Sequence, residues 1–314
     1  MIFGSICSGI EGASVAWLPL GWRCAWMAEI DPFCCAVLKH HYPEVPNYGD
    51  FTQIGVTVKA EPVDLIVGGT PCQDFSIAGF RAGLAGSRGQ LTLEFIRLID
   101  RMRPRWVVWE NVPGVLSIDH GRAFGTFLGA LGKCGYGFAY RILDARRFLP
   151  QSRPRVFVVG HIGGLWQRAA AVLFERASLS GNSASRRTTQ KVASTIPAHR
   201  TAGGGCYKIA RCLTIGEGRR QDYETCTFVP SRKRGVRRLT PRECERLQGF
   251  PDDYTLVPYR RKLASDGPRY RALGNSFAVP VVRWLGQRIQ MVEKSLNLWR
   301  GVNGLEAVRG GGST

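Results

Sequence analysis

A cysteine in a glycine-rich loop is the first feature of this sequence that could do chemistry. Cys72 stands in the run Gly68 to Gln73, directly after the apolar residues 64–67, for which the pattern predicts a strand. Open α/β sheets bind ligands at the carboxyl ends of their strands, and a thiolate there can attack an electrophilic ring carbon. Most intracellular cysteines are buried and inert, but the polar, glycine-rich flanks favour an accessible thiol here.

An acid and a pair of arginines follow the same logic. Glu110 ends the predicted strand 106–110. At the edge of a pocket of low dielectric constant the pKa of such an acid rises, so it can hold a proton for a ring nitrogen. Arg153 and Arg155 are two residues apart and share one side of an extended segment, where they can grip a phosphate or a base oxygen. A solvated acid and a solvated basic edge are the alternatives.

The run Cys7 to Gly12 follows the first predicted strand and opens a helix. Its glycines allow the chain to approach a ligand closely, and a helix N-terminus favours an anionic group. Glu29 ends the second predicted strand, where an acid can bind both hydroxyls of a ribose, and Asp50 is a candidate for contacting an adenine. Taken singly, an empty turn and solvated acids explain these features at least as well.

These residues must be positioned by a regular framework. Apolar runs alternate with helical patterns through residue 160, which is typical of a mostly parallel sheet covered by helices. We expect strands over 2–7, 24–30, 64–67, 106–110, 138–143 and 155–160. We expect helices over 12–18, 32–41, 91–102, 122–133, 240–248 and 278–296. Thr240 and Glu243 have the spacing of a capping box at the start of one of them.

The charge of the chain is spread unevenly. The 314 residues carry a net charge of +19, and residues 151–250 alone hold 19 basic and 6 acidic side chains. This excess favours a polyanionic partner, and nucleic acid rather than lipid because we find no basic amphipathic helix. With neither an apolar run of about 18 residues nor a signal peptide, we expect a cytoplasmic protein that does not enter the membrane. The ten cysteines are irregularly spaced, which argues against a disulfide framework.

In this order the stretches resemble the DNA cytosine-C5 methyltransferase family over nearly the whole chain. The matching stretches are Ser8 to Gly12, Glu29 with Asp31, Gly49 with Asp50, Pro71 to Gln73, Glu110 to Val112, Gln151 to Arg155, Arg238 to Glu243 with Leu247 to Pro251, and Gly274 to Ser276. The Pro-Cys-Gln and Glu-Asn-Val stretches are moderately specific, and the ordered set is strong.

The resemblance implies an α/β protein with the Rossmann-like fold of S-adenosylmethionine-dependent methyltransferases and a smaller target-recognition domain. It divides the chain into a catalytic and cofactor-binding domain over 1–162, a target-recognition region over 163–236, a segment over 237–300 that returns to the catalytic domain, and a disordered tail over 301–314. It also implies S-adenosyl-L-methionine as cofactor, double-stranded DNA as partner, and a monomeric bacterial or phage-encoded enzyme of the restriction-modification type. The sequence carries no readable code for the recognised site or for a partner endonuclease.

The family mechanism assigns roles to single residues. Cys72 adds to C6 of a flipped-out cytosine, Glu110 donates at N3, and Arg153 and Arg155 hold the base. Cofactor contacts are implied for Cys7, Ser8, Gly9, Ile10, Gly12, Glu29, Ile30, Asp50, Phe51, Pro71, Asn275 and Ser276. The stretch from Gln73 to Gln90 resembles the mobile lid of the family. DNA contacts are implied for Gln73, Ser76, Arg81, Arg88 and Gln151.

Two positions depart from the family pattern. The family usually has a phenylalanine, stacked on the adenine, where Cys7 stands, and a glycine where Glu11 stands. The first change removes a stacking surface for the cofactor, and the second alters the shape of the turn. Neither touches the chemistry expected at Cys72.

Three other functions or sites would account for part of these sequence features. A branch of the same family methylates tRNA cytosines, although the long basic block favours a reader of duplex grooves. A catalytically silent DNA-binding module would not need Cys72, Glu110, Arg153 and Arg155 together. We expect no metal site, because the spacings among His199, Cys206, Cys212 and Cys226 are wide and contain no C-x-x-C pair.

Overall fold

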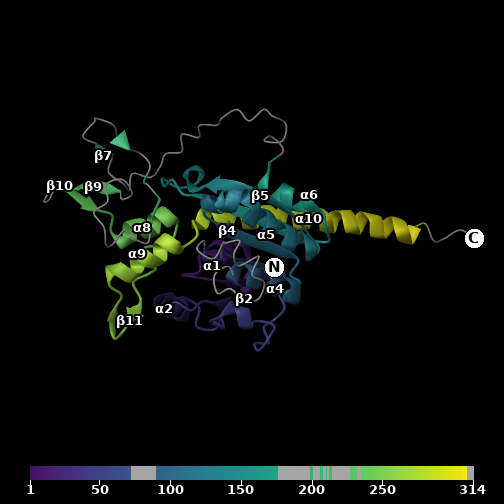
Figure 1. Cartoon of the computed structure of the whole chain (residues 1–314), viewed down its shortest axis with the longest axis horizontal. Helices are drawn as coiled ribbons and strands as arrows, with labels where there is room; N and C mark the ends of the chain where they lie inside the picture. Colours follow the sequence, from purple (N-terminus) through teal and green to yellow (C-terminus); the bar gives the residue numbers. More distant parts are fainter. Residues whose placement is uncertain are drawn as a thin grey trace, which may run out of the picture.

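A six-stranded sheet forms the centre of the protein, with helices on both of its faces (Figure 1). The computed structural model describes residues 1–71, 90–175, 199–200, 206–207, 210, 212–213, 227–231 and 235–309. The strands of this sheet are β1 (Ile2–Ile6), β2 (Arg23–Ala28), β3 (Leu65–Gly68), β4 (Trp106–Asn111), β5 (Tyr136–Asp144) and β6 (Pro154–Ile162). The main helices around it are α1 (Gly12–Trp17), α2 (Pro32–His41), α4 (Gln90–Met102), α5 (Arg122–Lys133), α6 (Trp166–Leu173) and α10 (Val279–Arg309).

The strand order is β2-β1-β3-β4-β6-β5. Strands β1 to β4 are parallel, and β6 runs antiparallel to both β4 and β5. The mostly parallel sheet predicted from the sequence is therefore confirmed, with β6 as the exception. The link between β5 and β6 is short and holds one turn of 3-10 helix, Ala145–Arg147, so the two strands pair as antiparallel neighbours.

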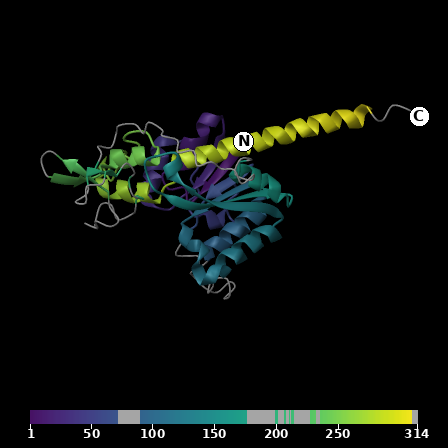
Figure 2. The ribbon, with the colours of Figure 1, turned by 90° about the horizontal axis from the view of Figure 1, so that it is seen from above.

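Alternate residues of the central strands face two separate cores. Leu65 and Val67 of β3 pack with α1, α2, α6 and α10, whereas Ile66 between them packs with α4 and α5. Trp106 and Trp109 of β4 divide in the same way. This two-residue period buries both faces of the sheet. Figure 2 shows α4 and α5 on one side of the sheet and α10 on the other.

A smaller group of elements, the smaller lobe, lies at one end of the sheet (Figure 1). It holds the hairpins β7 (His199–Arg200) with β8 (Cys206–Tyr207), β9 (Phe228–Ser231) with β10 (Gly235–Arg238), and β11 (Pro258–Tyr259) with β12 (Lys262–Leu263), together with the helices α8 (Pro241–Gln248) and α9 (Asp266–Asn275). The capping box expected for Thr240 and Glu243 is confirmed at the start of α8.

The structure corrects two expected boundaries. Helix α6 lies inside the block 163–236, yet it packs on β5 and β6, and its Ala169, Val172 and Leu173 are buried in the core of the large domain. The part of this block that can lie outside the large domain therefore begins after α6, and the target-recognition region stays a prediction for it. Helix α10 continues to Arg309, so the tail expected from residue 301 is helical for most of its length, and this end of the helix projects from the body (Figures 1 and 2).

Short 3-10 helices shape the loops at the ends of the strands. They are Leu18–Leu20, Phe51–Gln53, Pro113–Leu116 and Ile118–Gly121. In the part of the chain that the structure describes, no helix has the length and apolar character needed to span a bilayer.

Candidate active site

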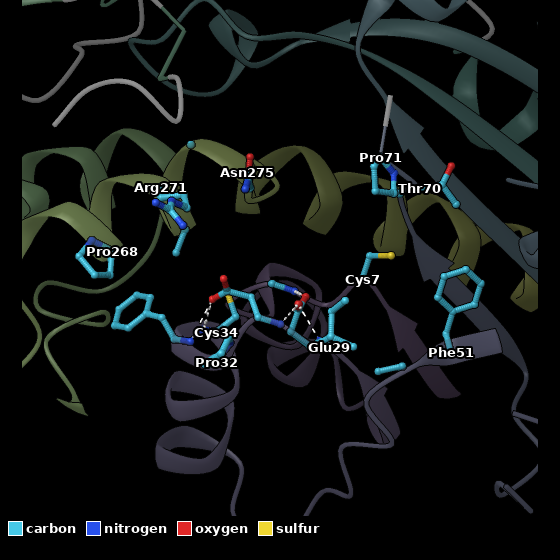
Figure 3. Close-up of a pocket in the computed structure, with 18 of the residues that line it drawn as sticks. Cys7, Glu29, Pro32, Cys34, Phe51, Thr70, Pro71, Pro268, Arg271 and Asn275 are labelled. Atoms are coloured by element: carbon cyan, nitrogen blue, oxygen red, sulfur yellow. Dashed lines mark hydrogen bonds between the residues drawn. The ribbon is translucent and has the colours of Figure 1, made fainter. Parts of the chain in front are cut away.

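A cavity of about 840 Å³ opens at the carboxyl ends of the parallel strands. The loops that follow β1, β2, β3 and β4 all contribute to its wall, and α9 closes it from the smaller lobe (Figure 3). Its lining includes Cys7, Gly9, Glu29, Ile30, Asp50, Phe51, Pro71, Glu110, Arg153, Arg155, Arg271 and Asn275. Residues from both halves of the sequence thus meet at one edge of the sheet.

The turn from Cys7 to Gly12 is held by hydrogen bonds on both sides. Ser8 donates from its hydroxyl to the carbonyl of Ser5 and accepts from the backbone N–H of Ala28. The N–H of Gly9 donates to Glu29 Oε2 at 2.7 Å. Cys7 and Gly9 line the cavity, whereas the side chains of Ser8 and Ile10 are buried behind the turn. The turn therefore presents main chain and a thiol to the cavity.

Glu29 is rigidly placed at the end of β2. Its Oε1 accepts from the N–H groups of Ile30 and Asp31, at 2.9 and 2.8 Å, and its Oε2 accepts from Gly9. A carboxylate has about four acceptor sites, so a free site remains on Oε2. This fits one ribose hydroxyl better than the two that the sequence pattern indicates. Ile30 is 75% exposed on the same wall, where it offers an apolar surface.

The far end of the cavity suits an aromatic ring with a polar edge. Phe51 and Pro71 provide apolar surface, and the carboxylate of Asp50 lies beside them. Asp50 Oδ1 caps the 3-10 helix Phe51–Gln53 through the N–H of Thr52. Its Oδ2 can accept from a different donor, such as an exocyclic amine. The residues present therefore fit an adenosine group with its ribose at Glu29.

The acid and one of the two arginines meet at the cavity wall. Arg155 Nε lies 3.1 Å from Glu110 Oε1, and both side chains are largely buried. The pairing of β4 with β6 brings them together, because Glu110 lies opposite Phe157, two residues after Arg155. Burial raises the pKa of Glu110 above its ordinary value, although the charges of Arg155 and Arg153 act in the opposite direction. The site thus holds a carboxyl that keeps its proton to a higher pH.

Arg153 has a different setting from the one expected. Its guanidinium is 3% exposed and donates to the carbonyl of Leu213 at 3.0 Å and to the carbonyls of Gly274 and Ser276, both at 2.8 Å. Burial lowers the pKa of Arg153 to about 10. Arg153 thus joins three segments of the protein through main-chain carbonyls, while its buried Nε has no hydrogen-bond partner among the described residues.

Gln151 does not have the accessible position expected of a DNA contact. Its side chain is fully buried, donates to the carbonyl of Leu247 at 2.7 Å and accepts from the N–H of Leu213 at 3.2 Å. A polar side chain between two segments satisfies buried backbone groups there. The expectation of a DNA contact is wrong for the conformation described.

The segment Gly274 to Ser276 completes the wall from the smaller lobe. Asn275 is exposed and lines the cavity, whereas Ser276 is buried and takes part through its carbonyl. Arg271, one helical turn before Asn275 on α9, lines the same wall. We did not predict Arg271 from the sequence, although its spacing from Asn275 could have indicated it. Gly12 packs behind this segment, where an added Cβ would lie 3.3 Å from Ser276 Oγ.

Five expected site residues, Cys72, Gln73, Ser76, Arg81 and Arg88, lie outside the described residues. Pro71, directly before the first of them, lines the cavity. In the described ranges, no group of three or more histidines, cysteines or acids is arranged to hold a metal ion.

Comparison with known proteins defines the class. The structure of Dnmt2 from S. pombe superposes with a TM-score of 0.69 at 18% identity and covers 95% of this chain and 99% of its own. The chain thus has the α/β fold of S-adenosylmethionine-dependent methyltransferases, as predicted.

The family follows from the sequence comparison. Residues 1–173 and 167–291 match the model of the C-5 cytosine-specific DNA methylases, so the chain belongs to that family and the resemblance of its motifs is confirmed. Type II methyltransferase M.HpaII of Haemophilus parainfluenzae is 30% identical over 95% of this chain and 90% of its own length. A protein of Escherichia phage P1 named DNA N-6-adenine-methyltransferase is 33% identical over 92% of this chain, which spans 61% of the phage protein.

Proposed function

We propose that this protein transfers a methyl group from S-adenosyl-L-methionine to C5 of a cytosine flipped out of duplex DNA, through a covalent bond between Cys72 and C6. The observation that carries the proposal is the Glu110–Arg155 pair on the wall of a cavity whose other end fits an adenosine. The pair supplies a proton donor and a fixed cation close to Gly69, three residues before Cys72, where an added Cβ would lie 3.2 Å from Glu110 Oε2. The family membership supports the same chemistry.

The reaction needs covalent activation because C5 of cytosine is a poor nucleophile. In the proposed mechanism the Cys72 thiolate adds to C6 while Glu110 donates its proton to N3, and the electron pair then available at C5 accepts the methyl group. The cofactor supplies that group as an electrophile on a positively charged sulfur. Loss of the C5 proton to a base then expels the thiolate, which restores Cys72, and the N3 proton returns to Glu110.

The site residues that the structure describes bind or position the base and the cofactor in this scheme. Arg155 holds Glu110 through Nε. Its Nη1 and Nη2, which also donate to the carbonyl of Pro154 and to Cys212 Sγ, each have a further N–H to offer the exocyclic oxygen of the base. Arg153 keeps the wall that carries Asn275 in place through its bonds to Gly274 and Ser276. Glu29, Asp50 and Phe51 bind the nucleoside part of the cofactor.

Base flipping is required because the reacting atoms of a paired cytosine are inaccessible inside the double helix. C6 and N3 of a stacked and paired cytosine cannot reach a cysteine thiol and the largely buried carboxyl of Glu110, so the base must leave the helix. The basic block 151–250 would bind the DNA backbone and supply the sequence recognition. We retain the proposals that the protein acts as a monomer and in the cytoplasm.

Adenine N6 methylation is the second candidate function, and the printed name of the phage P1 relative favours it. An exocyclic amine can attack the methyl group directly, so that reaction needs no added thiolate. The two functions therefore predict different dependence on Cys72 as well as different products.

One assay separates these functions. Purified protein is incubated with duplex DNA and S-adenosylmethionine carrying a labelled methyl group, and the DNA is digested to nucleosides. We expect label in 5-methyl-2′-deoxycytidine only, and none with Cys72→Ala. Label in N6-methyl-2′-deoxyadenosine that survives Cys72→Ala would overturn the proposal. A parallel reaction on tRNA tests the RNA alternative, which better turnover of tRNA than of duplex DNA would favour.

A further inference from the structure

The buried acid Glu11 has no role in the scheme above. It lies in the turn between β1 and α1 with φ 61° and ψ 56°, a left-handed conformation that favours glycine. Its side chain is 1% exposed and caps α1, since Oε1 accepts from the N–H and the hydroxyl of Ser14, both at 3.0 Å. The strained backbone is thus compensated by the side chain itself.

The second carboxyl oxygen of Glu11, Oε2, has no comparable hydrogen bonds from the residues that the structure describes. Oε2 is buried and accepts no hydrogen bond of good geometry among the described residues, although the nearby Ser5 hydroxyl, like Ser14, acts to lower the pKa of Glu11. An ionised carboxylate with an unsatisfied oxygen is costly to bury, whereas a neutral acid costs much less. The position therefore favours the protonated form.

The charges around Glu11 act in the same direction. The titratable groups that interact with it are Glu29 directly after β2, Cys24 on β2, Tyr42 after α2 and Tyr254 after α8. Burial keeps Cys24, Tyr42 and Tyr254 neutral near pH 7, so Glu29 supplies the charge that acts on Glu11. Arg283 of α10 donates instead to carbonyls at the other end of α1. Burial, with a further contribution from Glu29, raises the pKa of Glu11 to about 7.

Glu11 is linked to the cavity through the main chain on its N-terminal side. Gly9, two residues earlier, donates to the carboxylate of Glu29, and the carbonyl of Ile10 accepts from the hydroxyl of Tyr254 at 3.0 Å. A change at Glu11 therefore acts on the amide that fixes the acid expected to bind the ribose. Tyr254 and Glu29 hold the turn from opposite sides.

We propose that Glu11 is a positioning residue for cofactor binding, which as an uncharged acid holds the turn from Cys7 to Gly12 in its binding shape and weakens binding when it ionises. The inference rests on the proposed function only in taking this cavity as the site of S-adenosylmethionine. The sign follows from the chemistry: the neutral form exists below the pKa, so affinity is highest at low pH and falls as the pH rises through about 7.

The test is direct binding of labelled S-adenosylmethionine to the full chain between pH 6 and 8.5. We expect the dissociation constant of the wild type to rise about tenfold over this range. Glu11→Gln should bind as the wild type does at pH 6 and keep that affinity at pH 8.5, because an amide stays neutral and can still accept from Ser14. Glu11→Gly permits the left-handed backbone but loses the cap, so it should bind more weakly at every pH and without a slope.

The outcomes separate the two proposals. The wild-type series needs no variant, and equal affinity at pH 6 and 8.5 would overturn the role of Glu11, as would a slope retained by Glu11→Gln. Intact binding with a pH slope but no methyl transfer to DNA would overturn the proposed function alone. Failure of the wild type to bind at any pH would overturn both.

Discussion

Among the described residues, Glu110 is the one on which the proposed chemistry depends most. Its raised pKa comes from burial on a strand between apolar neighbours, and Arg155 keeps it aligned without removing the effect of burial. A protonated acid can donate to a ring nitrogen, whereas an ionised one can only accept. The activity it supports should therefore exist below its pKa in the protein and be lost as the pH rises through that value.

We predict that Glu110→Gln lowers kcat by about 100-fold or more, because an amide can donate a hydrogen bond but cannot transfer a proton. The alkaline fall in kcat of the wild type that is due to Glu110 should disappear in this variant. Methyl-transfer rates measured from pH 6 to 9 with saturating cofactor and DNA test this. Unchanged kcat in Glu110→Gln would show that no proton passes through residue 110.

The structure brings Glu110 and Arg155 together at the cavity wall and buries Arg153 and Gln151 among backbone groups, while the roles of all four stay predictions. The spacing in 151–155 indicates which residues share a side of the strand. It contains no sign that the partners of Arg153 are carbonyls about 60 and 120 residues further along the chain. Polar side chains that join distant segments cannot be told from ligand-binding ones by local pattern alone.

At the scale of elements, the strand ends make the site and Arg153 holds its wall. The guanidinium connects the start of β6 to the end of α9 and to residue 213, so the smaller lobe is attached next to the cavity. Buried Arg269 and Glu245, 3.1 Å apart, fix α9 from its other side. Asn275 and Arg271 are thereby held by contacts that do not involve the reacting groups.

We predict that Arg153→Met lowers the free energy of unfolding by roughly 3 kcal/mol, because three buried carbonyls lose their donor. Cofactor affinity should fall with it through displacement of Asn275. Arg155→Met is the matched comparison: it also loses stability, because it breaks the largely buried pair with Glu110, but it should keep cofactor affinity while its turnover fails. Denaturant unfolding and cofactor binding measure both. Wild-type stability in Arg153→Met, with loss of turnover only, would restore the base-binding role.

Periodicity predicted the strands of the large sheet and most of its helices, because their apolar residues alternate or recur over many positions. The short helices were harder. Helix α6 has eight residues after two glycines, too few to show a convincing repeat, and α9 carries Pro268 in its first turn. The orientation of β6 was not predicted either, since alternation is the same in parallel and antiparallel strands.

At the scale of the molecule, the basic side chains are concentrated in one part of the chain. The large domain before residue 151 is nearly neutral, and the excess of basic side chains follows it. Since α6 belongs to the core of the large domain, a recognition segment that could be exchanged runs over 176–236 rather than 163–236. DNA affinity should depend steeply on salt, because each phosphate contact releases a counterion.

We predict that replacing residues 176–236 with the counterpart from a related enzyme changes the methylated site and preserves dependence on Cys72. Charge reversal at Arg232, Lys233 and Arg234 is the control, and it should weaken binding to all DNA about equally, since phosphate contacts position the protein without reading bases. Bisulfite sequencing of DNA from expressing cells identifies the site. A chimera that still methylates the original site would place specificity elsewhere, most directly in residues 73–90.

The covalent step is the central claim, and trapping tests it most directly. Duplex DNA with 5-fluorocytosine at the methylated position should form a stable adduct with the protein in the presence of S-adenosylmethionine, because fluorine at C5 cannot leave as a cation. The adduct should resist denaturation, and mass spectrometry should locate it at Cys72. It should be absent from Cys72→Ala and should not accumulate without cofactor. An adduct that survives Cys72→Ala, or methylation of ordinary DNA by that variant, would contradict the account.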